Sequence, residues 1–191
     1  MVRWRPGTRE RLQAAALELF AERGFDQTTA ADIATAVGLT ERTFFRHFTD
    51  KREVLFDGQE LLVDAFLAGV AAAPADAPAL EVVAAALRSG AAFFPDERRA
   101  WSRLRQTVID RNPALLEREG HKMAELAAVI RTALLERGVA DPTATLAAGS
   151  GSTVFAVAFA QWIREGERRS LDQIEAAVLD DLRALTRTTP A

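Results

Sequence analysis

Residues 28–51 read TTAADIATAVGLTERTFFRHFTDK, and this stretch decides the fold of the chain. It predicts two short helices capped by Thr29 and Thr40, because a threonine side chain at an N-cap accepts a backbone N–H of the first turn. Residues 37–40 join the two helices and leave room only for a tight turn at their glycine. A longer amphipathic helix over 8–23 precedes the pair. This arrangement is typical of a helix-turn-helix.

The second helix of such a motif can lie in the major groove of DNA and present its N-terminal side chains to the bases. Arg42 can bond to guanine and Glu41 can accept from cytosine. The candidate DNA-binding residues on this helix are Thr40, Glu41, Arg42, Thr43, Phe45 and Arg46, with Arg3 and Arg5 along the same edge. A plain helical hairpin has the same spacing. Net charge does not decide between a DNA-binding motif and a plain hairpin, because residues 1–56 hold nine basic and eight acidic side chains.

The motif comes with a longer match to a known family. The run TRERLQAAALELFAERGF over 8–25, followed by the stretch quoted above, resembles the N-terminal head of TetR family transcriptional regulators. The resemblance covers residues 8 to about 56. It implies a homodimeric repressor with an N-terminal DNA-binding head and a C-terminal helical domain that binds a small inducer.

The resemblance also assigns individual roles. It implies that Thr29, His47 and Lys51 hold DNA phosphates, which suits the expected places of Thr29 and Lys51 at helix N-termini. Phe45 occupies a position that is usually Tyr in the family, where the hydroxyl reaches a phosphate. Because Phe45 has no hydroxyl, a packing contact with a sugar or a thymine methyl would have to replace that bond.

The remainder of the chain has helical periodicity and almost no strand alternation. It predicts helices over about 51–73, 79–94, 96–111, 113–137 and 141–164, and a final helix from Ser170. We therefore expect an all-α protein of about nine helices. A DNA-binding domain would span 1–50 and a ligand-binding and dimerisation domain 51–191, with the helix over about 51–73 as the connector.

Composition narrows the possible functions. The 191 residues are 49% apolar and 27% charged with a formal charge of −3, as in ordinary globular proteins. The chain has no cysteine and two histidines, so we expect neither a disulfide nor a metal site. No cofactor-binding or catalytic motif is present, which argues against an enzyme. The N-terminus has no apolar segment of the kind that directs secretion, and we expect a cytoplasmic protein.

The helix over about 143–164 is apolar on all sides, which indicates burial on all sides or a membrane span. Its serine, threonine and glutamine residues argue against a membrane. Burial on two faces is most simply met by the same helix of a second subunit, although one large monomeric core would also satisfy it. The candidate dimer interface is Gly149, Ser150, Thr153, Val157 and Ala160 on this helix, with Ile174, Val178, Leu182 and Leu185 on the last.

An aromatic-rich set of residues predicts a ligand pocket between helices, although the same residues could simply fill the core. Its members are Phe66, Phe93, Phe94, Trp101, Leu104, Arg105, Val108, Met123, Phe155, Phe159 and Trp162. Arg105 would either extend into water or meet an acidic head group. The function expected is a repressor released from a palindromic operator by a small, largely apolar inducer. A DNA-binding protein without a ligand is the alternative, and a helical enzyme is less supported.

Overall fold

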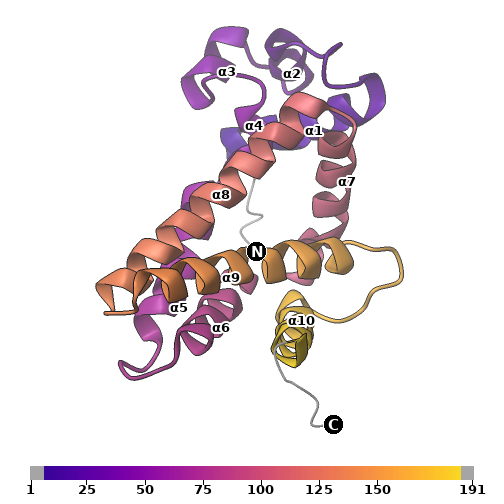
Figure 1. Cartoon of the computed structure of the whole chain (residues 1–191). Helices are drawn as coiled ribbons and strands as arrows, with labels where there is room; N and C mark the ends of the chain where they lie inside the picture. The colour runs from indigo at the N-terminus through magenta and orange to yellow at the C-terminus, as the bar shows by residue number, and fades with distance from the viewer. Residues whose placement is uncertain (1–6, 186–191) are drawn as a thin grey trace, which may run out of the picture. The chain divides into compact units, whose positions relative to one another are not determined.

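A computed structural model describes residues 7–185, so Arg3 and Arg5 lie outside the described residues. The described part of the chain is helical and contains no strand, which confirms the all-α prediction (Figure 1). The helices are α1 (Thr8–Arg23), α2 (Ala30–Ala36), α3 (Glu41–His47), α4 (Glu53–Phe56), α5 (Gln59–Ala72), α6 (Ala79–Ala91), η1 (Asp96–Arg98), α7 (Arg99–Asp110), α8 (Pro113–Glu136), α9 (Asp141–Trp162) and α10 (Leu171–Leu185).

The chain forms two compact units. The head unit comprises Met1–Asp57 and Trp101–Glu119, and the C-terminal unit comprises Gly58–Ala100 and Gly120–Ala191. The head unit is therefore larger than the predicted domain of residues 1–50. It also contains α4, most of α7 and the beginning of α8, because the corner between α7 and α8 packs into the same core as α1, α2 and α3.

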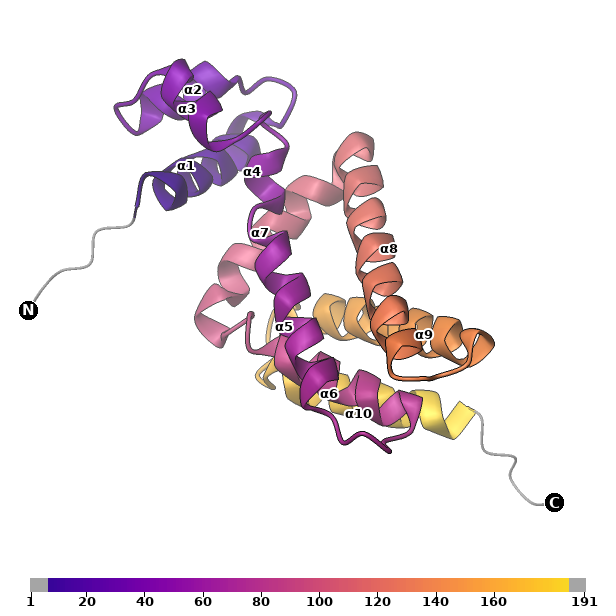
Figure 2. The ribbon, with the colours of Figure 1, turned by 90° about the vertical axis from the view of Figure 1, so that its left-hand side faces the viewer.

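The head unit is built around α1, whose buried stripe includes Leu12, Leu17 and Phe20. In Figure 2, α2 and α3 lie side by side and α2 packs against α1. The core is completed by Ile109 and Leu115 from the α7–α8 corner, which are fully buried. Helices α2, α3 and α4 have seven residues or fewer. They depend on packing against longer neighbours for their stability, since isolated helices this short do not persist in water.

The predicted helix over 51–73 is two helices in the structure. Helix α4 ends at Phe56, Asp57 is extended, and Gly58 has a φ of +86° before α5 begins. A side chain at this position would be strained by the left-handed backbone, and its Cβ would lie 3.2 Å from Cζ of Phe93. The prediction of one continuous connector helix was therefore wrong. Apolar residues recur at helical spacing on both sides of Gly58, so the periodicity did not reveal the break between α4 and α5.

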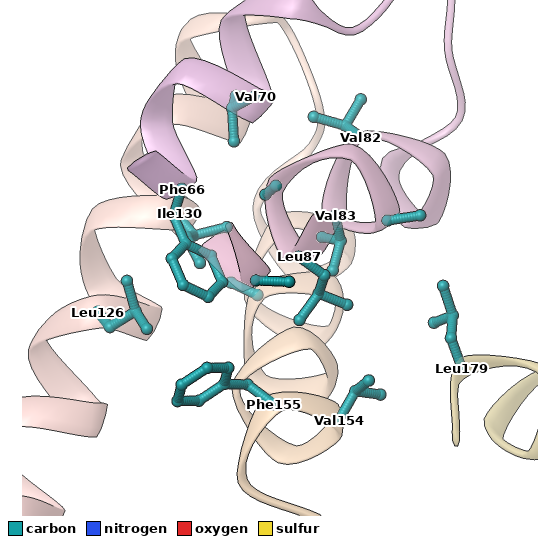
Figure 3. Close-up of a cluster of buried hydrophobic side chains, with 14 of the residues drawn as sticks. Phe66, Val70, Val82, Val83, Leu87, Leu126, Ile130, Val154, Phe155 and Leu179 are labelled. Atoms are coloured by element: carbon teal, nitrogen blue, oxygen red, sulfur yellow. The ribbon is translucent and has the colours of Figure 1, made fainter. Parts of the chain in front are cut away.

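The C-terminal unit has its own core, formed by α5, α6, α9, α10 and the later turns of α8. Figure 3 shows Phe66 and Val70 of α5 beside Val83 and Leu87 of α6. Close helix approach requires a glycine at Gly151 of α9, where a Cβ would lie 2.6 Å from a methyl carbon of Val83. This glycine therefore has a packing role inside the helix predicted over about 141–164.

Candidate DNA-binding and ligand-binding sites

Local hydrogen bonds fix the helix-turn-helix. Gly38 has a φ of +72°, and the backbone N–H of Leu39 donates to the carbonyl of Ala34 at 2.8 Å. At the start of α2, the Thr29 hydroxyl accepts from the N–H of Asp32 at 3.1 Å, and the Asp32 carboxylate accepts from the N–H of Thr29 at 2.9 Å. The hydrogen bonds from Thr29 hold the pKa of the Asp32 carboxyl below its ordinary value. The turn and both of its caps are thus encoded locally.

Helix α3 divides into a buried face and a charged, exposed face. Phe44 is fully buried, whereas Glu41, Arg42, Phe45 and Arg46 are exposed. Glu41, Arg42, Phe45 and Arg46 are four of the residues expected from the sequence to face DNA, whereas Thr43, also expected there, is half-buried. The exposed set includes both arginines of the helix. The arrangement places two cations and one aromatic ring on one short helix, which is suited to contact with base edges and phosphates.

The remaining candidates on and beside α3 have other partners. The hydroxyls of Thr40 and Thr43 lie 3.0 Å apart, and Thr40 accepts from the N–H of Thr43, so both act in the cap. His47 is half-buried, and its Nε2 atom has no hydrogen-bond partner among the described residues. A phosphate bond from His47 stays a prediction.

Lys51 does not begin a helix. Helix α4 starts at Glu53 with Arg52 at its N-cap, and the Asp50 carboxylate accepts from the N–H groups of Arg52 and Glu53 just before it. The Lys51 ammonium donates to the carbonyls of Phe25 at 2.8 Å and Thr28 at 3.0 Å. It also lies 4.3 Å from the centre of the Phe25 ring. Two of its three N–H groups therefore hold the segment between α1 and α2, and only the third is left for a phosphate.

Arg42 and Lys51 are expected to affect DNA binding in different ways. Arg42→Ala should cost about 1–3 kcal/mol per site, relax the preference at one base and leave thermal stability unchanged, because the side chain is exposed. Lys51→Met should lower the melting temperature and weaken binding to all sequences alike, because two carbonyls lose their donor. Fluorescence anisotropy with operator and random duplexes, together with thermal unfolding, measures both effects.

One outcome would contradict the structural role assigned to Lys51, which is to hold the backbone carbonyls of Phe25 and Thr28. If Lys51→Met left the melting temperature unchanged and reduced the salt dependence of DNA binding by about one charge per head, its main partner would be a phosphate.

Six of the predicted ligand residues form one aromatic cluster within the C-terminal unit. Phe94 is at its centre, with ring centres 5.2 Å from Phe93, 5.2 Å from Phe159 and 6.0 Å from Trp162. The Phe155 ring centre lies 5.8 Å from that of Phe94 and 5.5 Å from that of Phe66, and Phe66 and Phe155 are both labelled in Figure 3. Three of the rings are only partly buried, namely Phe93, Phe94 and Phe159. Met123 is partly buried against the same core.

The other four predicted ligand residues belong to the head unit. Val108 is buried in the head core, so its assignment to a pocket with the aromatic cluster was wrong. Trp101 packs against that core, and Leu104 is exposed. Arg105 donates from Nε to the carbonyl of Leu55 at 2.7 Å and from Nη1 to Glu119 at 2.9 Å. Helical periodicity places an apolar residue on a face but does not say which element covers that face.

The predicted dimer interface on α9 is solvent-exposed in the single chain. Val157 is 49% exposed and Leu146, on the same face, is 71% exposed. Gly149, Thr153 and Ala160 are also exposed, and Ser150 is half-buried. Helix α9 has the length and composition of a membrane-crossing helix. Of its most apolar stretch of 18 residues, 39% is buried inside the structure. A core helix of a soluble protein passes the same test.

The predicted residues on α10 separate into three groups. Ile174 is fully buried in the core of its own unit, so its assignment to the interface was wrong. Val178 and Leu182 are half-buried and pack against that core. Leu185 is 84% exposed. The apolar stripe of α10 is thus used mainly within the subunit.

A buried acid on α10 was missed from the sequence. Glu175 is 2% exposed, and neither of its carboxyl oxygens has a hydrogen-bond partner among the described residues. Burial raises the pKa of Glu175 to about 9, and the nearby negative charge of Asp172 adds to the rise. The signal was available, because Glu175 is four residues from both Leu171 and Leu179 on the buried stripe.

Two family models match successive parts of the chain. Residues 12–57 match the bacterial regulatory proteins of the tetR family, and residues 77–187 match the MftR C-terminal domain, which alone is more than half of the chain. The chain belongs to the TetR family. The first model covers the N-terminal segment of the head unit, and the second includes the 101–119 segment of that unit together with most of the C-terminal unit. The resemblance inferred from residues 8–56 is confirmed.

Individual relatives are more distant. A stretch of 82 residues, 43% of this chain, is 42% identical to the HTH-type transcriptional regulator TcmR of Streptomyces glaucescens, and it spans only about a third (36%) of that protein. FadR of Thermus thermophilus, solved with lauroyl-CoA, is 23% identical, with a TM-score of 0.57 and coverage of 96% of this chain and 97% of that one. FadR of Bacillus halodurans is 15% identical, with a TM-score of 0.64 and coverage of 97% and 100%. At these identities the two structures show a shared fold.

Proposed function

We propose that this TetR family member is a homodimeric cytoplasmic repressor that leaves a palindromic operator when a small, largely apolar ligand binds its C-terminal unit. The observation that supports ligand binding is the aromatic cluster around Phe94. Six rings in contact, three of them only partly buried, offer a large apolar surface that a ligand could complete. Binding, and not catalysis, is the chemistry that this surface supports.

The exposed face of α3 supports the DNA half of the proposal. Arg42 and Arg46 would enter the major groove, and a twofold dimer would place two such helices about one helical turn of DNA apart. An operator with two inverted half-sites follows from that symmetry. The salt-dependent contacts would come from exposed basic side chains of the head, since phosphate neutralisation dominates protein–DNA affinity.

The outward face of α9 supports the dimer. It presents Leu146 and Val157 to solvent, and the small residues Gly149 and Ala160 between and beside them allow the backbones of two subunits to approach closely. Because Leu146 and Val157 lie on one face with small side chains between them, they offer an apolar strip that a second subunit could cover.

The arginine expected near the pocket argues for an uncharged buried ligand group. Arg105 donates to the Glu119 carboxylate and to the carbonyl of Leu55, so its guanidinium already has partners within the head unit. The buried part of the ligand would then be an acyl chain or a neutral ring system. The lauroyl-CoA bound to the Thermus thermophilus FadR, which has this fold, is a suitable first probe.

The proposal is tested with an operator selected by the full-length protein from random duplexes. Lauroyl-CoA and a library of neutral hydrophobic compounds are added in thermal-shift and gel-shift measurements, with coenzyme A as the matched control without the chain. We expect a ligand that raises the melting temperature by mass action and weakens operator binding by roughly 5–150-fold. Ligands that stabilise the protein and leave operator affinity unchanged would overturn the regulatory proposal. Absence of any stabilising compound would favour a DNA-binding protein without a ligand.

A further inference from the structure

Gln59 is a polar residue on the inward face of α5. Leu62 and Phe66, three and seven residues later on the same face, are buried in the core of the C-terminal unit. The Nε2 atom of Gln59 is itself buried and has no hydrogen-bond partner among residues 7–185. A buried amide N–H without an acceptor costs free energy, because it has lost the water that bonds to it in the unfolded chain. The fold therefore keeps an unsatisfied donor at this position.

The face of α5 that carries Gln59 borders the aromatic cluster at two points. A Cβ at Gly58, the residue before Gln59, would lie 3.2 Å from Cζ of Phe93. Two turns along the same face, the ring centre of Phe66 is 5.5 Å from that of Phe155 (Figure 3). The unsatisfied donor thus lies on the part of α5 that packs beside the rings.

The chemistry of this donor narrows the group that would complete it. The indole N–H of Trp162, also in the cluster, donates to Asp96 at 3.3 Å, so its hydrogen bond is already made within the chain. Gln59 needs an acceptor from outside. An amide has no charge to balance an anion, and burial of an unbalanced carboxylate costs far more than one hydrogen bond returns. A carbonyl oxygen fits, because it accepts without bringing a donor that would need its own partner.

We propose that Gln59 anchors the ligand of the C-terminal unit by donating from Nε2 to an uncharged carbonyl oxygen, while the apolar part of the ligand packs on the rings around Phe94. The inference rests on the proposed function, since it takes the aromatic cluster as the site of an apolar ligand. It narrows the ligand class to ketones, esters, thioesters and amides. Hydrocarbons and thioethers of the same shape lack the acceptor and leave the amide unsatisfied.

The test compares probes that differ only in this oxygen. Lauroyl-CoA is paired with S-dodecyl-CoA, and benzophenone with diphenylmethane, so that each pair exchanges a carbonyl for a methylene group. Dissociation constants are measured by isothermal titration of the full-length protein. We expect the carbonyl member to bind about three- to tenfold more tightly, which corresponds to one hydrogen bond between neutral groups. Equal affinities within both pairs would overturn the inference.

Gln59→Met connects the preference to this side chain. Methionine is unbranched, is close to glutamine in length and has no donor, so the variant should bind both members of a pair equally. Without a probe it should melt no lower than the wild type, because an apolar group replaces an unsatisfied polar one. Gln27→Met is the matched control and should keep the wild-type preference, since Gln27 is exposed in the head unit. A Gln59→Met protein that still prefers the carbonyl would assign the contact to another residue and overturn the inference.

The outcomes separate this inference from the proposed function. If a carbonyl probe and its methylene partner bind equally and both weaken operator binding, the regulatory proposal stands and the role of Gln59 fails. If the carbonyl probe binds more tightly and operator affinity stays unchanged, Gln59 keeps its role and the regulatory proposal fails. If neither pair binds, both fail.

Discussion

Val157→Arg should convert the protein from a dimer to a monomer and abolish cooperative binding to a two-site operator. Val157 is 49% exposed in the single chain, so an arginine there need not enter the core of its own subunit. In a twofold interface the same change occurs twice, and each unpaired charge removed from water costs several kcal/mol. Sedimentation velocity at micromolar concentration, followed by gel shift, measures both losses.

A matched variant separates dimer loss from a general effect of surface charge. Ala128→Arg places the same side chain at an exposed position of another long helix, α8, and should leave the dimer intact. Circular dichroism should show the same helix content for both variants. A wild type that sediments as a monomer, or a dimeric Val157→Arg protein, would contradict the assignment of α9 to the interface.

Glu175→Leu should stabilise the protein, and the gain should increase with pH. The pKa of Glu175 is raised from an ordinary value near 4.5 to about 9 in the folded chain. The folded state therefore holds a proton that the unfolded state releases between these values, and its stability relative to the unfolded state falls as pH rises through this window. The loss is about 1.4 kcal/mol per pH unit, or roughly 3 kcal/mol by pH 7. Leucine removes this loss and adds apolar burial.

The measurement is urea unfolding between pH 5 and pH 8 at a fixed protein concentration, because the stability of a dimer depends on concentration. Glu175→Gln is the matched control, since it removes the ionisation and retains a buried polar group. Both variants should show a flatter dependence of unfolding free energy on pH than the wild type, with Gln less stable than Leu. Parallel curves for all three proteins would mean that the carboxyl group finds a partner or water.

The head could be predicted in detail because its signals are local. Thr29 and Thr40 cap helices within three residues of themselves, and Gly38 bends the chain between them. Such hydrogen bonds depend on neighbouring residues alone and so can be read from one stretch of sequence. The same locality gave the exposed face of α3, because the helix buries a single side chain, Phe44, and the charged residues lie away from it.

Lys51 and Val108 show where local reasoning ends. The sequence predicts Lys51 at a helix N-terminus, yet its ammonium reaches back over more than twenty residues to two carbonyls. Val108 lies on an apolar stripe, and the stripe packs against α-helices of the head and not around the aromatic cluster. Both assignments depend on contacts between residues distant in sequence, which periodicity does not report.

Sequence alone determined the helical class, the turn at Gly38 and the charged face of α3, because helix periods, caps and turns are interactions within a few residues. Only tertiary structure decided that the connector breaks at Gly58 and that Ile174 faces inward and Val157 outward. It also decided that Glu175 is buried with no hydrogen-bond partner for its carboxyl group within residues 7–185. The physical reason is that a helix with apolar residues on several faces has several ways to pack. Which face is covered depends on the volumes and close approaches of helices that come from distant parts of the chain.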